Sequence, residues 1–176
     1  DQLVARAERD SLTGLLNSET TRLRIGQQLD ALAGGERGAL LVVDVDCFKD
    51  VNDTHGHLVG DLVLADIARI LRENFRIGDV VGRLGGDEFM VYLDRVGSTD
   101  VVLGKCDRLR RAVERHEYPG TDCRVTISVG VVLAHAGDTF DDLYGRADEA
   151  LYAAKRDGRN RCGLADGALR SPKAAP

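Results

Sequence analysis

The fold is decided by the stretch Val80-Val81-Gly82-Arg83-Leu84-Gly85-Gly86-Asp87-Glu88-Phe89-Met90-Val91-Tyr92-Leu93. Two short runs rich in apolar residues, 80–83 and 89–93, flank a glycine pair. Gly85 and Gly86 supply the positive φ angles that a tight hairpin turn demands. The stretch therefore predicts a β-hairpin whose turn also carries two acidic residues.

The sequence predicts another strand before this hairpin. The apolar run over residues 39–45 ends in the acidic residues Asp44 and Asp46, as expected of a central strand that is buried on both faces and opens into a polar site. Pairing with the hairpin would bring these acids to Asp87 or Glu88, and hard carboxylate oxygens suggest Mg²⁺. Because consecutive strand residues point to opposite faces, we expect only one of Asp87 and Glu88 to share a pocket with Asp44 if the ladder is regular.

Basic residues and the glycine turn extend this hypothesis to a nucleotide triphosphate. Gly85 and Gly86 leave the turn without side chains, so a phosphate or a base can approach the backbone. Lys49, Lys155 and Arg159 can hold phosphate oxygens while a divalent cation neutralises their charge. Any one of these residues alone is common in surface turns, and only their combination favours a nucleotide site.

The rest of the chain alternates helical and extended patterns. Apolar spacing predicts a helix, a turn and a second helix within residues 1–33, with the break at 10–14. Three more helices are expected over about 61–75, 99–115 and 141–156, and one more strand over about 124–133. Residues 163–176 lack periodicity and predict a disordered tail.

Composition excludes several classes of protein. The chain has 176 residues, 43% of them hydrophobic, and a net charge of −5, which favours one compact domain and argues against a surface for polymeric nucleic acid. Its longest apolar stretch, residues 39–43, is far shorter than the roughly 20 residues of a membrane-spanning helix. We expect no membrane contact by this fragment.

Cysteine spacing and the first residue bear on location. The four cysteines, Cys47, Cys106, Cys123 and Cys162, form no Cys-x-x-Cys pair, which fits neither a zinc site nor a dense disulfide framework. A reducing cytoplasm is the simpler interpretation. Because the chain begins with Asp1, we expect a piece of a longer protein whose other part could hold a membrane anchor or a sensor domain.

Four ordered motifs resemble the GGDEF family of diguanylate cyclases, over roughly residues 10–162. The signature itself is Gly85-Gly86-Asp87-Glu88-Phe89. The other three are Asp10-x-Leu12-Thr13-Gly14-Leu15-x-Asn17, Asp44-Val45-Asp46-x-Phe48-Lys49-x-Val51-Asn52-Asp53-x-x-Gly56-His57-x-x-Gly60-Asp61, and Ala147-Asp148-x-Ala150-Leu151-Tyr152-x-Ala154-Lys155-x-x-Gly158-Arg159-Asn160.

This resemblance implies an α+β fold with a central mixed, mostly antiparallel five-stranded sheet flanked by helices, related to the polymerase palm and class III nucleotidyl cyclases. It implies a stalk or linker helix over residues 1–9 and a diguanylate cyclase domain over 10–162, with the tail over 163–176.

The same resemblance assigns residues to the metal and to catalysis. It implies that Asp44, the backbone carbonyl of Val45 and Asp87 ligate Mg²⁺, or Mn²⁺ in its place. Asp87, or less readily Glu88, would assist removal of the proton from the attacking hydroxyl. Lys49 would stabilise charge on the α-phosphate.

Further residues are implied in substrate binding. Asn52 and Asp61 would read the guanine edge, since an amide and a carboxylate match its donors and acceptor. Asp46 would orient Lys49 or the metal. His57 is as readily a structural hydrogen-bonding residue as a nucleotide ligand. The resemblance also assigns to the substrate site Phe48, Gly86, Lys155 and Arg159.

The implied reaction joins two GTP molecules into cyclic di-GMP with loss of two pyrophosphates. Because one domain holds one GTP, the active form is expected to be a symmetric homodimer. Arg76-Ile77-Gly78-Asp79 resembles the family's Arg-x-x-Asp product-inhibition site, and Arg108 is a second expected contact from a neighbouring domain.

Two other functions fit the same motifs less well. A non-catalytic module that only binds GTP or cyclic di-GMP would be expected to lack some of the acidic, basic and guanine-reading residues, which are all present. A cyclase that also accepts ATP would be expected to lack the carboxylate of Asp61.

Overall fold

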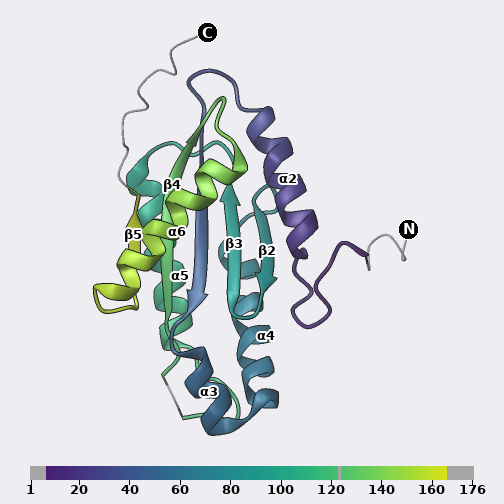
Figure 1. Cartoon of the computed structure of the whole chain (residues 1–176), viewed down its shortest axis with the longest axis vertical. Coiled ribbons are helices and arrows are strands. Elements are labelled where there is room, and N and C mark those ends of the chain that lie inside the picture. The colour runs from purple at the N-terminus through teal and green to yellow at the C-terminus, as the bar shows by residue number, and fades with distance from the viewer. Residues whose placement is uncertain (1–6, 123, 166–176) are drawn as a thin grey trace.

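The computed structural model describes residues 7–122 and 124–165 (Figure 1). Within them five strands form one sheet in the order β2-β3-β1-β4-β5. The strands are β1 (Arg37–Val45), β2 (Val80–Gly85), β3 (Glu88–Leu93), β4 (Ile127–His135) and β5 (Cys162–Leu164), and the helices are α2 (Ser18–Asp30), α3 (Phe48–His55), α4 (His57–Asn74), α5 (Thr99–Arg115) and α6 (Phe140–Arg156). Only the β4–β5 pair is parallel within the described part of the chain, so the predicted mixed, mostly antiparallel sheet is confirmed.

Strand β1 lies at the centre of the sheet because it is apolar on both faces. It pairs antiparallel with β3 on one side and with β4 on the other. Its residues alternate between two cores: Leu41 and Val43 pack into one, and Leu40 and Val42 into the other. This is the burial expected of a strand covered on both faces.

Two helices cover each face of the sheet (Figure 1). Helices α4 and α5 contribute Val63, Ile67, Val102 and Leu109 to the core on one face. Helices α2 and α6 contribute Ile25, Leu29, Leu143 and Ala147 to the core on the other. The three layers leave the carboxyl end of β1 at one edge of the molecule, beside α3 (Figure 1).

The predicted hairpin is confirmed. Gly85 and Gly86 have φ angles of 133° and 52°, which residues with a Cβ rarely adopt. The pairing of β2 with β3 shifts register between Arg83 and Gly85, and Asp87 falls in the turn rather than in the ladder. This irregularity decides where the two acids of the turn point.

Sequence patterns missed or misplaced short elements. Helix α3 was not predicted, because its eight residues bury only Val51 and give no periodic signal. Helix α4 begins at His57, four residues before the expected start at 61, after Gly56 with a φ of 87°. The chain at 163–165 was expected to be disordered, but Gly163 and Leu164 belong to β5.

Parts of both predicted terminal segments lie outside the described residues. Of the stalk helix expected over residues 1–9, residues 1–6 lie outside the described part. Most of the predicted tail, residues 166–176, lies outside it as well. No helix among the described residues has the length and apolar character needed to cross a bilayer.

The structure corrects the expectation that the cysteines are reduced. Cys106 of α5 and Cys162 of β5 form a disulfide across 56 residues of sequence, with their Cα atoms 6.5 Å apart. Spacing could not indicate this pair, because the packing of α5 beside β5 brings the two residues together. Cys47 is free and exposed.

Candidate active site

Acidic residues from two strands meet where β1 ends. Asp44 of β1 lies directly opposite Glu88 of β3 in the antiparallel ladder. The backbone N–H of Val45 donates to the carbonyl oxygen of Asp87 over 3.2 Å. The structure thus brings Asp44, Val45, Asp87 and Glu88 together from segments more than 40 residues apart in the sequence.

The condition under which only one of Asp87 and Glu88 would share a pocket with Asp44, a regular ladder, is not met. Burial raises the pKa of Asp44, the hydrogen bond from Lys155 opposes that rise, and the neighbouring Asp87 carboxylate raises the pKa further. Burial also raises the pKa of Glu88, which lies near the charge of Asp44. Alternation applies only to a regular ladder, and Asp87 lies in the turn before β3 begins.

The donor set around Asp44 suits a hard divalent cation. The neighbouring Asp87 carboxylate makes ionisation of Asp44 less favourable, and a cation between the two would relieve this. The described residues include no group of three or more His, Cys, Asp or Glu side chains arranged as a metal site. Two carboxylates and the Val45 carbonyl would leave the remaining positions to phosphate and water, the coordination that Mg²⁺ usually takes.

Lys155 contacts one of these two acids, Asp44. Its Nζ atom, at the end of α6, donates to Oδ2 of Asp44. Asp44 is largely buried, with 14% of its side chain exposed, and 35% of the Lys155 side chain is exposed. The lysine expected at the terminal phosphates therefore sits beside the carboxylates expected to hold the metal.

Helices α3 and α4 form a second part of the site around Asn52. A Cβ atom on Gly60 would lie 1.8 Å from Asn52 Oδ1 and 3.2 Å from Phe48 Cζ, so the absence of that atom makes room for both side chains. Asn52 Oδ1 is buried without a hydrogen-bond partner in the structure. A buried acceptor of this kind fits an N–H donor of a bound base.

The other residues expected to bind substrate surround these two centres. Lys49 of α3 and His57 and Asp61 of α4 are exposed. Gly85 and Gly86 are exposed as well, and a Cβ atom on either would meet open space. Arg159 is exposed in the loop after α6 and has a left-handed φ of 61°.

Asp46 is held by hydrogen bonds from β4 and its neighbourhood. Its carboxylate accepts hydrogen bonds from Thr126 Oγ1 at 2.8 Å, Ser128 Oγ at 2.6 Å and the backbone N–H of Asn160 at 3.0 Å. These contacts join Asp46 to β4 and to the loop after α6, and its expected role of orienting Lys49 or the metal stays a prediction.

Sequence reasoning missed two side chains that hold the glycine turn and Glu88. Arg83 donates to both carboxylate oxygens of Asp10, at 3.1 and 3.2 Å, and to the carbonyl of Gly86 at 2.7 Å. The hydroxyl of Tyr144 donates to Glu88 Oε1 over 2.8 Å. Arg83 stands two residues before Gly85, which was a usable signal, whereas the approach of Tyr144 on α6 depends on helix packing.

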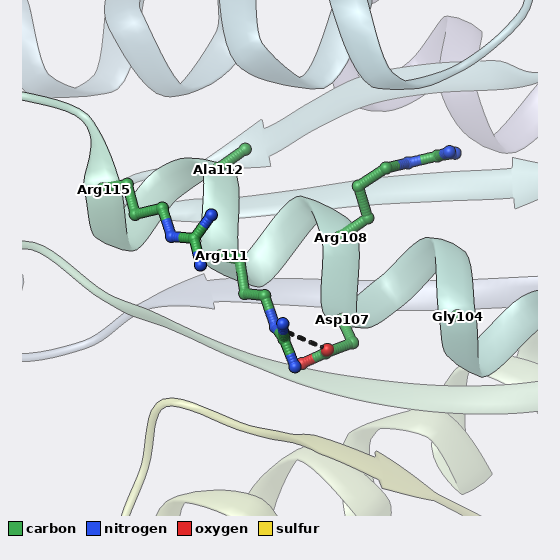
Figure 2. Close-up of a pocket in the computed structure, with 6 residues that line it drawn as sticks. All are labelled: Gly104, Asp107, Arg108, Arg111, Ala112 and Arg115. Carbon is green, nitrogen blue, oxygen red and sulfur yellow. Dashed lines mark ion pairs between the residues drawn. The ribbon is translucent and has the colours of Figure 1, made fainter.

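The residues expected to bind inhibitory product line separate pockets. Arg76 donates from Nε to Asp79 Oδ1 over 3.3 Å, and both line a cavity of about 380 Å³ together with Arg24 and Arg72. Arg108 lines another cavity of about 410 Å³ on α5 (Figure 2). Arg76 and Arg108 of one chain therefore do not form one site.

Comparison with known proteins agrees with this geometry. Residues 7–161 match the family model described as "Diguanylate cyclase, GGDEF domain". The chain is 40% identical over 162 residues to diguanylate cyclase DgcM of Escherichia coli (strain K12), covering 92% of this chain and 39% of that protein. It is 39% identical over 139 residues to diguanylate cyclase A of Treponema denticola, covering 77% and 37%. The chain thus spans less than half the length of these relatives.

A solved structure supports the same relationship. The coiled coil and GGDEF domain of DgcB from Caulobacter crescentus, crystallised with c-di-GMP, superposes with a TM-score of 0.85 at 31% identity. The match covers 93% of this chain and 88% of that one. With the family model matched over residues 7–161, this chain belongs to the GGDEF domain family of diguanylate cyclases.

Proposed function

We propose that this domain condenses two molecules of GTP into cyclic di-GMP and two pyrophosphates, with Mg²⁺ and as a homodimer. The observation that carries this proposal is the approach of Asp44 and Asp87 beside the exposed glycine turn. Family membership and the names of the relatives supply the reaction.

Asp44, Asp87 and the Val45 carbonyl would hold the metal. Bound Mg²⁺ would neutralise the triphosphate and lower the pKa of the attacking 3′-hydroxyl. Asp87, or Glu88 beside it, would receive the hydroxyl proton. The hydrogen bond from Tyr144 keeps Glu88 turned toward this region.

Guanine recognition is assigned to Asn52 and Asp61. The unpaired, buried Oδ1 of Asn52 would accept from the base, and the carboxylate of Asp61, one residue after Gly60, would accept a second N–H. Leaving such a buried acceptor unmatched costs about 1–3 kcal/mol. The carboxylate of Asp61 would favour guanine, whose N1–H can donate to it, over adenine, whose N1 is an acceptor.

Lys49, Lys155 and Arg159 would hold the phosphates. Lys155 donates to Asp44, so its ammonium group lies beside the proposed metal ligands. Metal and triphosphate binding would transfer it from the carboxylate to phosphate oxygen, and Lys49 would neutralise charge that develops on the α-phosphate.

Two chains are needed, because each 3′-hydroxyl must attack the α-phosphate of the other nucleotide. A symmetric dimer with the two sites facing each other supplies both attacks. We further propose that cyclic di-GMP binds Arg76 and Asp79 of one domain and Arg108 of another, and so inhibits the enzyme. We also propose that this domain acts in the cytoplasm as one part of a longer protein that has a sensor domain.

The test is product formation by the chain itself. Incubation with GTP and Mg²⁺ is expected to give cyclic di-GMP and pyrophosphate, detected by chromatography and a coupled phosphate assay. Asp87→Asn is expected to lower turnover by at least about a thousandfold without lowering the melting temperature, because it removes a metal ligand. Asp30→Asn at the end of α2 is the matched control and should turn over normally.

The outcomes separate two functions. Near-normal turnover by Asp87→Asn would contradict the metal assignment. Binding of GTP or cyclic di-GMP without any product, in the unsubstituted chain, would instead identify a non-catalytic receptor module.

A further inference from the structure

The loop after α6 has an unusual backbone at the residues proposed to hold phosphate. Gly158, Arg159 and Asn160 have φ angles of 119°, 61° and 47° in succession. Left-handed φ is unfavourable for a residue with a side chain, above all for one as long as arginine. Such a conformation persists only when surrounding contacts hold it.

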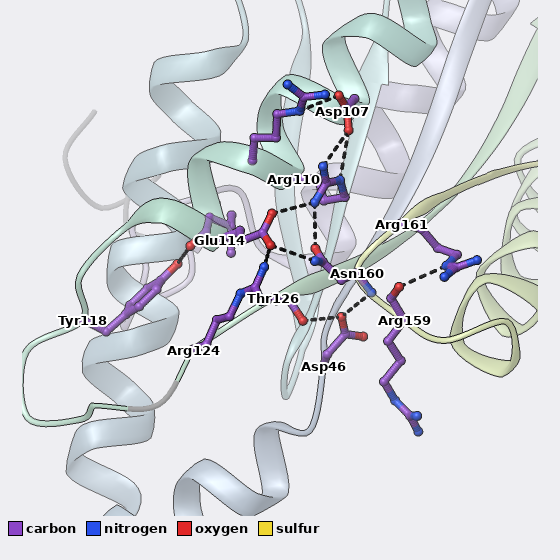
Figure 3. Close-up of polar contacts among 12 residues, drawn as sticks. Asp46, Asp107, Arg110, Glu114, Tyr118, Arg124, Thr126, Arg159, Asn160 and Arg161 are labelled. Atoms are coloured by element: carbon purple, nitrogen blue, oxygen red, sulfur yellow. Dashed lines mark hydrogen bonds and ion pairs between the residues drawn. The ribbon is translucent and has the colours of Figure 1, made fainter.

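The side-chain amide of Asn160 supplies one set of these contacts (Figure 3). Its Nδ2 donates to Glu114 Oε1 over 3.0 Å, and its Oδ1 accepts from Arg110 Nη1 over 3.0 Å. Arg110 also donates to Glu114 Oε2 over 2.7 Å, and these two side chains are only 15% and 16% exposed. A side-chain amide can donate to the carboxylate and accept from the guanidinium at once.

The backbone of Asn160 is held from the opposite side. Its N–H donates to Oδ2 of Asp46 over 3.0 Å, and the same carboxylate accepts from Thr126 and Ser128. Asp46 is 8% exposed and follows the last residue of β1. Asn160 therefore connects α5 to the strand end that carries Asp44.

Arg159 points away from this cluster of contacts (Figure 3). Its backbone N–H donates to Ala154 and its carbonyl accepts from Arg161 Nε, while its side chain is exposed. The direction of its guanidinium is thus set by the backbone that Asn160 holds. We propose that Asn160 is a positioning residue that aims Arg159 at the terminal phosphates of GTP, an inference that rests on the function proposed above.

Nucleotide binding by variants of the chain tests this. Asn160→Asp keeps the size of the side chain and the N–H to Asp46 but places a carboxylate against Glu114. By calorimetry, it is expected to weaken binding of a non-hydrolysable GTP analogue by at least about tenfold, and binding of GMP by less than about twofold. A role in holding the terminal phosphates predicts this difference between the two nucleotides.

A double-mutant cycle separates this inference from the proposed function. If Asn160 acts through Arg159, then Asn160→Asp in an Arg159→Ala background should cause no further loss. Equal losses for GMP and the GTP analogue, or full additivity with Arg159→Ala, would overturn the positioning role. An Arg159→Ala variant that binds the GTP analogue normally would instead overturn the phosphate role proposed for Arg159, and this inference with it.

Exchanging the two partner groups gives a rescue. The double variant Asn160→Asp with Glu114→Gln reverses donor and acceptor across the contact and keeps one carboxylate beside Arg110. It is expected to recover binding of the GTP analogue to within about threefold of the original chain. Recovery of melting temperature without recovery of that binding would show a purely structural contact and overturn the proposal.

Discussion

At the scale of single residues, Asp44 is subject to interactions that raise its pKa and to others that lower it. Burial and the charge of Asp87 raise its pKa, and Lys155 opposes this rise. It also lies opposite Glu88 in the sheet. Acids gathered in a partly buried place repel one another, so the folded chain gives up stability here that a bound cation would restore.

Arg76, which is proposed to bind the inhibitory product, is 61% exposed and paired with Asp79. Arg76→Ala is expected to raise the concentration of cyclic di-GMP needed for half inhibition by at least about tenfold, because a forked donor to phosphate and guanine is lost. Initial rates of the variant, measured without added cyclic di-GMP, should stay within about twofold of those of the original chain.

The matched control for this change is Arg69→Ala, which removes another exposed arginine paired within α4. Inhibition curves of the control should coincide with those of the original chain. Unchanged inhibition in Arg76→Ala would remove this residue from the proposed inhibitory site.

At the scale of elements, two contacts between neighbours shape the site. Helix α3 packs on the first turn of α4 through Asn52 and Gly60, where a Cβ atom has no room. The turn between β2 and β3 is tied by Arg83 to Asp10, which lies just before α2. The N-terminal segment thus has a direct polar connection to the glycine turn.

Gly60→Ala tests the contact between α3 and α4. The new methyl group is expected to displace Asn52 and raise KM for GTP at least about tenfold. The melting temperature should fall little, because alanine is favoured over glycine within a helix by about 1 kcal/mol. Gly145→Ala on α6, where a Cβ atom meets nothing within 4 Å, is the control and should leave KM unchanged. An unchanged KM in Gly60→Ala would argue against guanine binding at Asn52.

The contact of Asp10 with Arg83 should appear in the pH dependence of stability. Burial works against ionisation of Asp10, but hydrogen bonds from Thr13 and Arg83 lower its pKa below the usual 3.8. As pH falls, the unfolded chain takes up the proton first, so the stabilising effect of the carboxylate is complete above the usual pKa. It is lost as pH falls through the lower pKa of the folded state.

Chemical denaturation of the original chain and of Asp10→Asn checks this. The difference in free energy of unfolding is expected to be about 1 kcal/mol and constant between about pH 7 and pH 5, and to shrink below about pH 4. A difference that grows as pH falls would contradict the assignment of the lowered pKa to Asp10.

At the scale of the whole molecule, the proposed nucleotide site lies at the edge of the three-layer fold where β1 ends. The acids, the glycine turn and the buried Oδ1 of Asn52 are all near this edge. The proposed reaction forms two bonds between two nucleotides. One chain would therefore supply one of the two nucleotide sites that the reaction requires.

Mixing experiments test the need for two competent chains. A tenfold excess of Asp87→Asn protein is expected to lower cyclic di-GMP formation per original chain by about tenfold, because most dimers then hold one impaired site. Excess Asp30→Asn protein should add its own activity instead. Formation that is indifferent to the impaired chains would show that one chain suffices.

Much of the architecture could be predicted because it depends on local pattern. The apolar run of β1, the glycine-separated hairpin and the spacing within α5 each specify an element through neighbouring residues. The motif of acids and glycines likewise indicated which residues gather at the site. Short elements such as α3 and β5 carry too few residues for such a pattern, and β5 exists through its pairing with β4.

By itself the sequence determined the family, the central strand, the hairpin and the set of acidic, basic and amide residues proposed for the site. Only the tertiary structure decided that Asp87 and Glu88 both lie near Asp44, that Cys106 pairs with Cys162, and that Asn160 is held by α5. The reason is physical: periodicity reports which face of an element is apolar, whereas these contacts join elements far apart in the chain through an irregular turn, a packed helix and a left-handed loop.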